Sequence, residues 1–225
     1  MTGAFTPERV NVGVLGAKLW QRPEEPVAPE RARKPIEEKE SYRWLEGYAL
    51  ACEVQQPCPQ TVVVSVADCE GDIPEWFLDT RGRAGEERAE VLIRAKCNRR
   101  LTPGAQHDYL GDKMVAARPL GKSTFMLSRQ ADRPPRRVTL TVTARPVTFK
   151  GARRPGGRLP PVEVWTVYAK ELSLPRARPL VNGACSRVCR WQTSPGRAPS
   201  CSGIEQGGKS NFFPVCLNTA ATSSG

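Results

Sequence analysis

Residues 61–67 read TVVVSVA and lead directly into an acidic turn, DCEGD, at residues 68–72. A continuous β-branched run of this length is typical of a strand that is buried on both faces of a sheet. The following turn contains glycine and three acids, which ends the strand at residue 67. The pattern predicts a central strand of an α/β domain, with carboxylates at its carboxyl end.

Three further segments within residues 1–100 fit the same α/β domain. Residues 11–20 (NVGVLGAKLW) and 90–96 (EVLIRAK) have the composition of strands. Residues 36–54 predict a helix, because Pro35 suits its first turn. The apolar residues of this helix recur at helical spacing and form one stripe: Leu45, Tyr48, Ala49 and Cys52.

Residues 101–174 have a different pattern. Proline and arginine separate three short alternating runs, which are STFML at 123–127, RVTLTVTA at 137–144 and VEVWTVYA at 162–169. A period of two residues is typical of strands with one buried face. This segment therefore predicts a β-rich, mostly antiparallel insertion that follows the first domain.

Residues 175–225 show no usable period. Glu205 is the one acid among the last 50 residues, and serine, glycine, proline and cysteine dominate the rest. This composition predicts an unstructured C-terminal tail. The chain thus divides into an α/β domain at 1–100, an insertion at 101–174 and a tail at 175–225.

The charge distribution indicates a polyanionic partner. The 225 residues carry a formal net charge of +11, with 39% hydrophobic and 25% charged residues. Between Arg94 and Arg158 there are 16 Lys and Arg against three Asp, an excess of 13 positive charges that leaves the rest of the chain at −2. Such a segment favours nucleic-acid binding, because each phosphate that is neutralised releases a condensed counterion. A solubilising face is the alternative.

The chain shows no secretory signal and no apolar stretch of the length that a membrane helix needs. We therefore expect a cytoplasmic protein without a membrane partner. Of its eight cysteines, Cys185 and Cys189 form a CxxxC pair, but the lone His107 is far from them in sequence. This spacing is a weak indication of zinc, and we expect free thiols.

Asp68 is the centre of the candidate chemistry. A carboxylate at the carboxyl end of a buried strand is well placed to hold a divalent metal ion. Two-metal phosphoryl transfer needs such carboxylates, because the ions bridge the attacking and leaving oxygens. An acid at a strand end is more often an N-cap or a turn residue, so both interpretations remain open at this point.

Several motifs in a fixed order resemble the DDE transposases of bacterial insertion sequences. Residues 37–48 (EEKESYRWLEGY) and 62–77 (VVVSVADCEGDIPEWF) resemble the KESxRWLEG helix and the DREGDIYE strand end of the insertion-sequence-four-like family. Residues 6–10 and 12–20 look like the second and third strands of that family. Residues 92–100 (LIRAKCNRR) look like its basic strand.

The resemblance covers about residues 5–174 and implies a ribonuclease-H-like catalytic core. It implies that Asp68 is a catalytic carboxylate and a ligand of Mg²⁺ or Mn²⁺. It also implies that the basic strand faces DNA through Arg94, Lys96, Arg99 and Arg100. The family acts as a homodimer on double-stranded transposon ends, by metal-dependent phosphodiester cleavage and strand transfer.

The chain departs from the family pattern in three ways. Cys69 replaces a basic residue beside the catalytic Asp. The strand that bears the first catalytic Asp would precede Met1, so we expect an incomplete core that lacks its first strand. The helix with the final catalytic Glu is also not found, which leaves two of three carboxylates missing. Because an open sheet edge attracts other strands, we expect the chain to be aggregation-prone.

A shifted reading frame explains the tail. Read from the third codon position, residues 181–191 permit EWRLLT, which resembles the next strand of the family. In the same frame residues 203–211 permit YRARWEIE, which resembles its late Glu helix. Our hypothesis is that the natural frame is lost between Leu174 and Val181, so that the tail is out of frame.

Two classes of function follow from these observations. The first is a transposase segment, whose lineage function is DNA transposition. The second is a non-catalytic, basic DNA-binding remnant. An ordinary α/β protein is a third and plainer alternative. Because Asp68 is the one family carboxylate present, we expect no catalysis from this chain.

Overall fold

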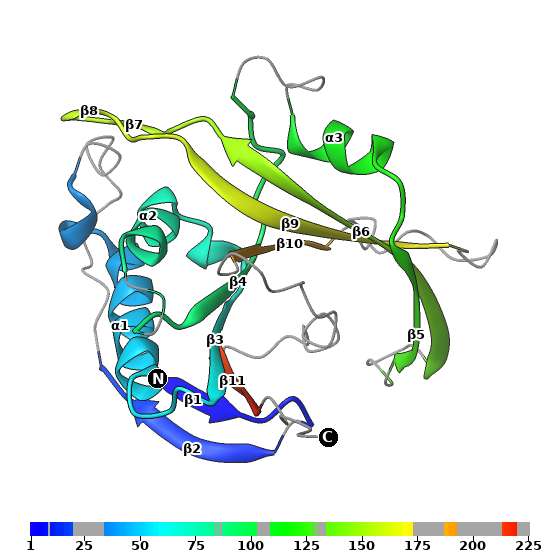
Figure 1. Ribbon diagram of the computed structural model, residues 1–225, viewed down its shortest axis with the longest axis horizontal. Coiled ribbons are helices and arrows are strands. Elements are labelled where there is room, and N and C mark those ends of the chain that lie inside the picture. The colour runs from blue at the N-terminus through cyan, green and yellow to red at the C-terminus, as the bar shows by residue number, and fades with distance from the viewer. Residues whose placement is uncertain are drawn as a thin grey trace.

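The computed structural model describes residues 1–8, 10–19, 34–83, 85, 87–102, 109–127, 129 and 134–172, and the backbone of two further strands. Its main feature is one nine-stranded mixed sheet in the order β2-β1-β11-β3-β4-β10-β9-β6-β5 (Figure 1). These strands are β1 (Thr2–Phe5), β2 (Asn11–Gly16), β3 (Thr61–Ala67), β4 (Glu90–Arg94), β5 (Gly121–Leu127), β6 (Arg136–Phe149), β9 (Val162–Glu171), β10 (Arg187–Gln192) and β11 (Phe213–Thr219). A separate two-stranded hairpin consists of β7 (Arg153–Arg154) and β8 (Gly157–Arg158).

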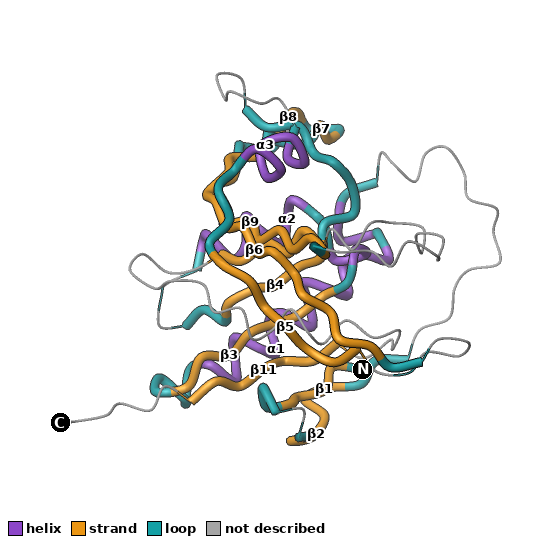
Figure 2. The backbone as a smooth tube through the Cα atoms, turned by 90° about the vertical axis from the view of Figure 1, so that its right-hand side faces the viewer, coloured by secondary structure: helices purple, strands orange, loops and turns teal. Residues whose placement is uncertain are grey.

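The described helices are short. They are the 3₁₀ turns η2 (Ile36–Glu38), η3 (Glu40–Tyr42) and η4 (Cys69–Gly71), and the α-helices α1 (Arg43–Gln55), α2 (Pro74–Gly82) and α3 (Leu110–Ala116). The protein is therefore a mixed α/β fold in which strands predominate. Figure 2 shows the strands crossing the molecule with the helices beside them.

The predicted helix over 36–54 forms only in part. The α-helix begins at Arg43, and two 3₁₀ turns precede it. Lys39 separates those turns, because its backbone is extended, with φ −94° and ψ 144°. A continuous helix cannot pass through that conformation.

The predicted strands of the first domain are present, and two of them are shorter than predicted. β3 spans the predicted residues 61–67, while β2 ends at Gly16 and β4 ends at Arg94. The described residues of the segment 6–10 (6–8 and 10), which resembles the second strand of the family, are not part of a strand. They form the turn between β1 and β2, where the Thr6 amide donates to the Val10 carbonyl oxygen at 2.9 Å.

The predicted insertion is antiparallel, because residues 136–142 of β6 pair with the whole of β5 and residues 140–149 of β6 pair with the whole of β9. It is not a separate sheet, however. β9 pairs with β10 and β10 pairs with β4, so the insertion continues the sheet of the first domain. The helix α3 within it was not predicted, because its seven residues are too few to show a helical period.

The prediction of an unstructured tail over 175–225 is corrected at two places, the strands β10 and β11. β10 lies between β4 and β9, and β11 lies between β1 and β3. Both positions are inside the sheet, where a strand satisfies the backbone groups of two neighbours at once. Most other residues of this segment lie outside the described part of the chain, and the shifted reading frame stays a prediction.

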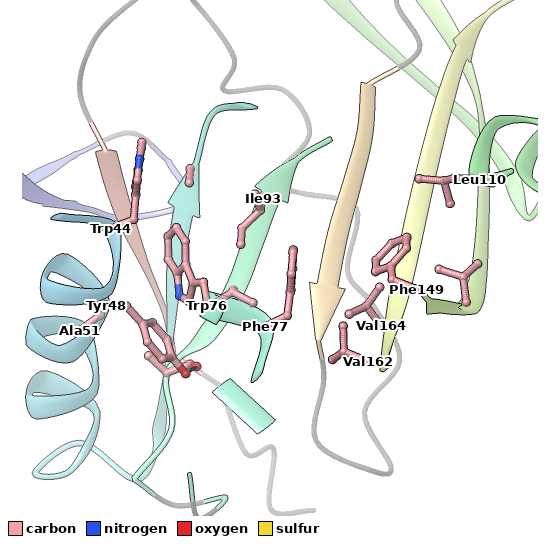
Figure 3. Close-up of a cluster of buried hydrophobic side chains, with 14 of the residues drawn as sticks. Trp44, Tyr48, Ala51, Trp76, Phe77, Ile93, Leu110, Phe149, Val162 and Val164 are labelled. Carbon is pink, nitrogen blue, oxygen red and sulfur yellow. Dashed lines mark hydrogen bonds between the residues drawn. The ribbon is translucent and has the colours of Figure 1, made fainter. Parts of the chain in front are cut away.

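The core that supports β3 and β4 is aromatic. Trp44 and Tyr48 of α1 pack against Trp76 of α2, with ring centroids 5.7 and 5.8 Å from the Trp76 ring (Figure 3). The Tyr48 hydroxyl donates to the Ala89 carbonyl oxygen at 2.8 Å, just before β4. Burial raises the pKa of Tyr48, so the hydroxyl remains a proton donor. These contacts hold α1 and α2 against β3, the strand that ends just before Asp68.

Candidate functional site at the carboxyl ends of β3 and β4

Asp68 and Arg94 lie next to each other at one edge of the sheet. β3 and β4 are parallel, and Ala67 is in register with Ile93. Asp68, which follows Ala67, and Arg94, which follows Ile93 and ends β4, are therefore neighbours as well. Both side chains are exposed. The structure thus brings together a predicted catalytic carboxylate and the first predicted DNA-binding arginine.

Asp68 is the N-cap of the turn η4. Its Oδ1 accepts a hydrogen bond from the Glu70 amide at 2.8 Å. This is the capping role that the sequence left open as an alternative, because an acid at this position satisfies an otherwise unpaired N–H group. One carboxylate oxygen, Oδ2, remains without a hydrogen-bond partner among the described residues.

Gly71 allows the turn to close over the core. A Cβ atom at this position would lie 2.6 Å from Ala67 Cβ and 2.8 Å from the Trp76 ring. Real Cβ atoms essentially never approach other atoms so closely. The glycine of the DCEGD sequence is therefore required by packing, independently of any chemistry at Asp68.

Glu70 forms an ion pair with an arginine. Arg43, in the first turn of α1, donates to Glu70 Oε2 at 2.5 Å and to Glu40 Oε1 at 2.8 Å. Arg43 belongs to the KESYRWLEG segment, so this segment contacts the acidic turn directly. Sequence reasoning did not assign this role to Arg43, because the two residues are 27 positions apart.

Asp72 also forms an ion pair with an arginine, and its side chain is fully buried. Its Oδ1 lies 3.0 Å from Arg99 Nη2, and its Oδ2 accepts the Lys96 amide at 2.8 Å. The Arg99 guanidinium also donates to the Asp72 carbonyl oxygen and lies 5.9 Å from the Phe149 ring centroid. Arg99 is therefore held by an acid of the same fold, which is the alternative to DNA contact for this residue.

The other three predicted DNA-binding residues are exposed. Arg94 ends β4, Lys96 follows it, and the Arg100 guanidinium lies 5.6 Å from the Tyr109 ring centroid. Among the described residues none of the three forms an ion pair. Their positive charges are therefore available to an external anion.

The carboxylates of this edge do not fit a two-metal site. Glu70 is bound to Arg43, Asp72 is buried against Arg99, and Asp68 has one oxygen in its cap. Within the described part of the chain, no three His, Cys, Asp or Glu side chains are grouped closely enough to hold a metal ion. Cys69 beside Asp68 is a free thiol, as are Cys52, Cys58 and Cys97, which confirms the expected thiols where the structure describes them.

A second polar link joins the first domain to the insertion. Arg154 of the β7–β8 hairpin donates to both Glu75 oxygens, at 2.5 and 2.9 Å, in the first turn of α2. Burial raises the pKa of Glu75, but hydrogen bonds from Arg154 and the positive charges of Arg154 and Lys39 lower it further, so the pKa lies below its ordinary value. No sequence signal marked this pair, because its members are 79 positions apart.

No protein-family model matches the chain, and no curated protein matches it. The resemblance to DDE transposases rests on the motifs at 37–48, 62–77 and 92–100. Among the residues that the structure describes, no helix has the length and apolar character to cross a membrane.

Proposed function

We propose that this chain is a transposase-derived, cytoplasmic protein that binds double-stranded DNA without cleaving it. The lineage function is DNA transposition by metal-dependent phosphodiester cleavage and strand transfer. The observation that carries the proposal is the state of the acidic turn. Glu70 and Asp72 are paired with arginines, so Asp68 alone offers a free carboxylate oxygen next to an exposed basic strand end.

The arrangement of the first domain supports a ribonuclease-H-like lineage. β3 bears Asp68, β4 bears the basic sequence, and α1 bears the KESYRWLEG segment that contacts the acidic turn. β1 and β2 lie on the other side of β11. β11 therefore occupies the inner position that the resemblance assigns to the first strand of the family.

The electrostatics support a DNA partner. Arg94, Lys96 and Arg100 are exposed within the segment that has an excess of 13 positive charges. Each contact between such a side chain and a phosphate releases about one counterion, which favours binding at low salt. Contacts of this kind bind DNA without reading its sequence.

The same geometry argues against catalysis by residues 1–225. Phosphodiester transfer by two metal ions needs several carboxylates that hold the ions about 3.5–4 Å apart. Mg²⁺ prefers near-octahedral oxygen ligation and retains several waters, so a single protein carboxylate binds it weakly. The chemistry that the metal would supply, activation of a water or 3′-hydroxyl nucleophile, has no sufficient ligand set in the described residues.

The test combines binding with cleavage. The triple variant Arg94→Ala, Lys96→Ala, Arg100→Ala should bind a duplex with a salt slope smaller by about 2.7, which is about 0.9 for each lost phosphate contact. Purified protein should not nick supercoiled DNA with magnesium or manganese. An unchanged salt slope in the triple variant would show that these three residues do not contact DNA. Nicking by the wild-type chain that disappears in Asp68→Ala would show that the chain is an enzyme.

A further inference from the structure

One face of the insertion carries threonines and cations in register. Lys122 on β5 is paired with Thr141 on β6, and Thr141 is paired with Lys170 on β9. Side chains of directly paired residues lie on the same face of a sheet. These three residues therefore form one row across three adjacent strands, with a lysine at each end. Both lysines are exposed.

The next row toward the far ends of β5 and β6 also carries hydroxyls, and the row beyond it pairs Arg137 with the exposed Met126. Thr124 and Thr139 are paired in the next row, with their hydroxyl oxygens 3.0 Å apart. Arg137 lies in the row beyond, and it is exposed. We call this surface the threonine–lysine face, defined by Lys122, Thr124, Arg137, Thr139 and Lys170; the hydroxyl of Thr141, between the two lysines, is buried. Its strands β5 and β6 extend away from α1 and α2 (Figure 1).

The threonine–lysine face contains no acid. β5 and β6 have no Asp or Glu, and the two acids of β9 point to the opposite face by alternation. Those acids are also occupied, since Glu163 lies 3.5 Å from Arg81 and Glu171 is paired with Arg136. Among the described residues, neither Lys122 nor Lys170 forms an ion pair.

The opposite face of the same strands is apolar. Val138, Leu140, Val142 and Ala144 are buried there with Val167 and Ala169 of β9. The strands therefore bury one side and leave cations and hydroxyls on the other. Neither Lys122 nor Lys170 belongs to this buried apolar cluster. Both lysines can therefore be replaced without loss of buried apolar area.

We propose that the threonine–lysine face binds the phosphate backbone of double-stranded DNA, as a second surface separate from Arg94, Lys96 and Arg100. This inference rests on the proposed DNA-binding function. Lysine and threonine side chains are both common donors to phosphate oxygens. A face without carboxylates attracts a polyanion without local repulsion.

The face fits duplex DNA better than a single strand. Proteins that bind single strands stack the bases on exposed aromatic rings. Within the described part of the chain, the aromatic ring on this side of β9 is that of Tyr168, which is half-buried and packs against the main hydrophobic core. With cations and hydroxyls but no stacking platform, the face offers contacts only to the backbone.

Arg94 and the threonine–lysine face lie on opposite sides of the sheet. Arg94 shares its face of β4 with Leu92, and Leu92 packs in one cluster with Val142 and Ala144. Val142 and Ala144 face away from the threonine–lysine face. One surface can therefore be altered without changing the other, and their contributions to binding should add.

The experiment measures the salt dependence of duplex binding by the full chain. Lys122→Ala with Lys170→Ala should lower the salt slope by about 1.8, in the wild-type background and in the variant that lacks Arg94, Lys96 and Arg100. The control Lys18→Ala with Lys34→Ala removes the same charge from exposed positions outside the basic segment 94–158 and should leave the slope unchanged. Lys122→Arg with Lys170→Arg should restore it, and circular dichroism should show an unchanged fold for every variant.

Three outcomes would overturn the inference. If the double variant Lys122→Ala with Lys170→Ala has the salt slope of the wild type, the threonine–lysine face does not bind DNA. The proposed function would stand in that case. Tighter binding of a single strand than of the duplex would remove the duplex assignment. A wild-type chain that binds no duplex at all would overturn both the proposed function and this inference.

Discussion

Arg99 pairs with Asp72 inside the fold, with Arg99 Nη2 3.0 Å from Asp72 Oδ1 and the Asp72 side chain fully buried. The pair joins the end of the acidic turn to the segment that follows β4. Two charged residues of the segments that resemble the family are thus used to hold the acidic turn against the segment after β4.

Replacing Arg99 with alanine should destabilise the protein strongly. The change leaves the Asp72 carboxylate buried without its cation, which typically costs about 3–5 kcal/mol. Arg100→Ala is the matched control, because Arg100 is exposed and forms no ion pair among the described residues. Urea denaturation measures both free energies of unfolding. Equal values for the two variants would contradict the structural role of Arg99.

Asp68 should contribute to stability as a cap. Asp68→Ala removes the acceptor of the Glu70 amide, which typically costs about 1 kcal/mol. Asp68→Asn keeps an oxygen acceptor and should retain most of that stability. The free energies of unfolding of the two variants decide the matter. A loss of the same size in both would mean that charge, and not the cap, is what the turn needs.

Gly71→Ala should overpack the turn. The added methyl group would lie 2.6 Å from Ala67 Cβ and 2.8 Å from the Trp76 ring, so backbone or ring must move. Overpacking of this kind costs about 1–3 kcal/mol. Gly82→Ala is the control, because a Cβ atom there meets nothing within 4 Å. Thermal unfolding that is equally lowered in both variants would argue against the close packing.

The Glu75–Arg154 pair should make stability depend on pH. The pKa of Glu75 is lowered in the folded protein, so the pair stabilises the fold above the ordinary value of 4.5. That contribution is lost as the pH falls below 4.5 and through the folded pKa. Glu75→Gln should therefore be less stable than wild type at pH 7, by about 1.5–3 kcal/mol.

The difference between Glu75→Gln and wild type should shrink as the pH falls below 4.5. Denaturation curves of both proteins between pH 3 and pH 7 measure it. A difference that stays constant over this range would show that the carboxylate charge does not contribute. Glu53→Gln is a suitable control, since no ion pair involves Glu53 among the described residues.

Removing residues 211–225 should open the sheet. β11 pairs with β1 on one side and β3 on the other, so its loss exposes the backbone groups of both strands. The shortened chain should aggregate at concentrations where the full chain does not. Light scattering of the two proteins tests this. A monomeric shortened chain with an unchanged thermal transition would show that β11 does not complete the sheet.

The sequence by itself determined the elements whose patterns are local. A continuous β-branched run defined β3 to the residue, and alternation predicted β5, β6 and β9, because burial of one side chain in two is visible within a few residues. The position of Asp68 at the carboxyl end of β3 followed from the same run.

Only the tertiary structure decided which charges are free. Arg99 and Arg100 are adjacent and look alike in sequence, yet Arg99 meets a buried carboxylate 27 positions away while Arg100 does not. Likewise β10 and β11 acquire their places from open positions within the sheet and not from any period of their own. Ion pairs and strand neighbours depend on which distant segments meet, and a local pattern carries no record of that.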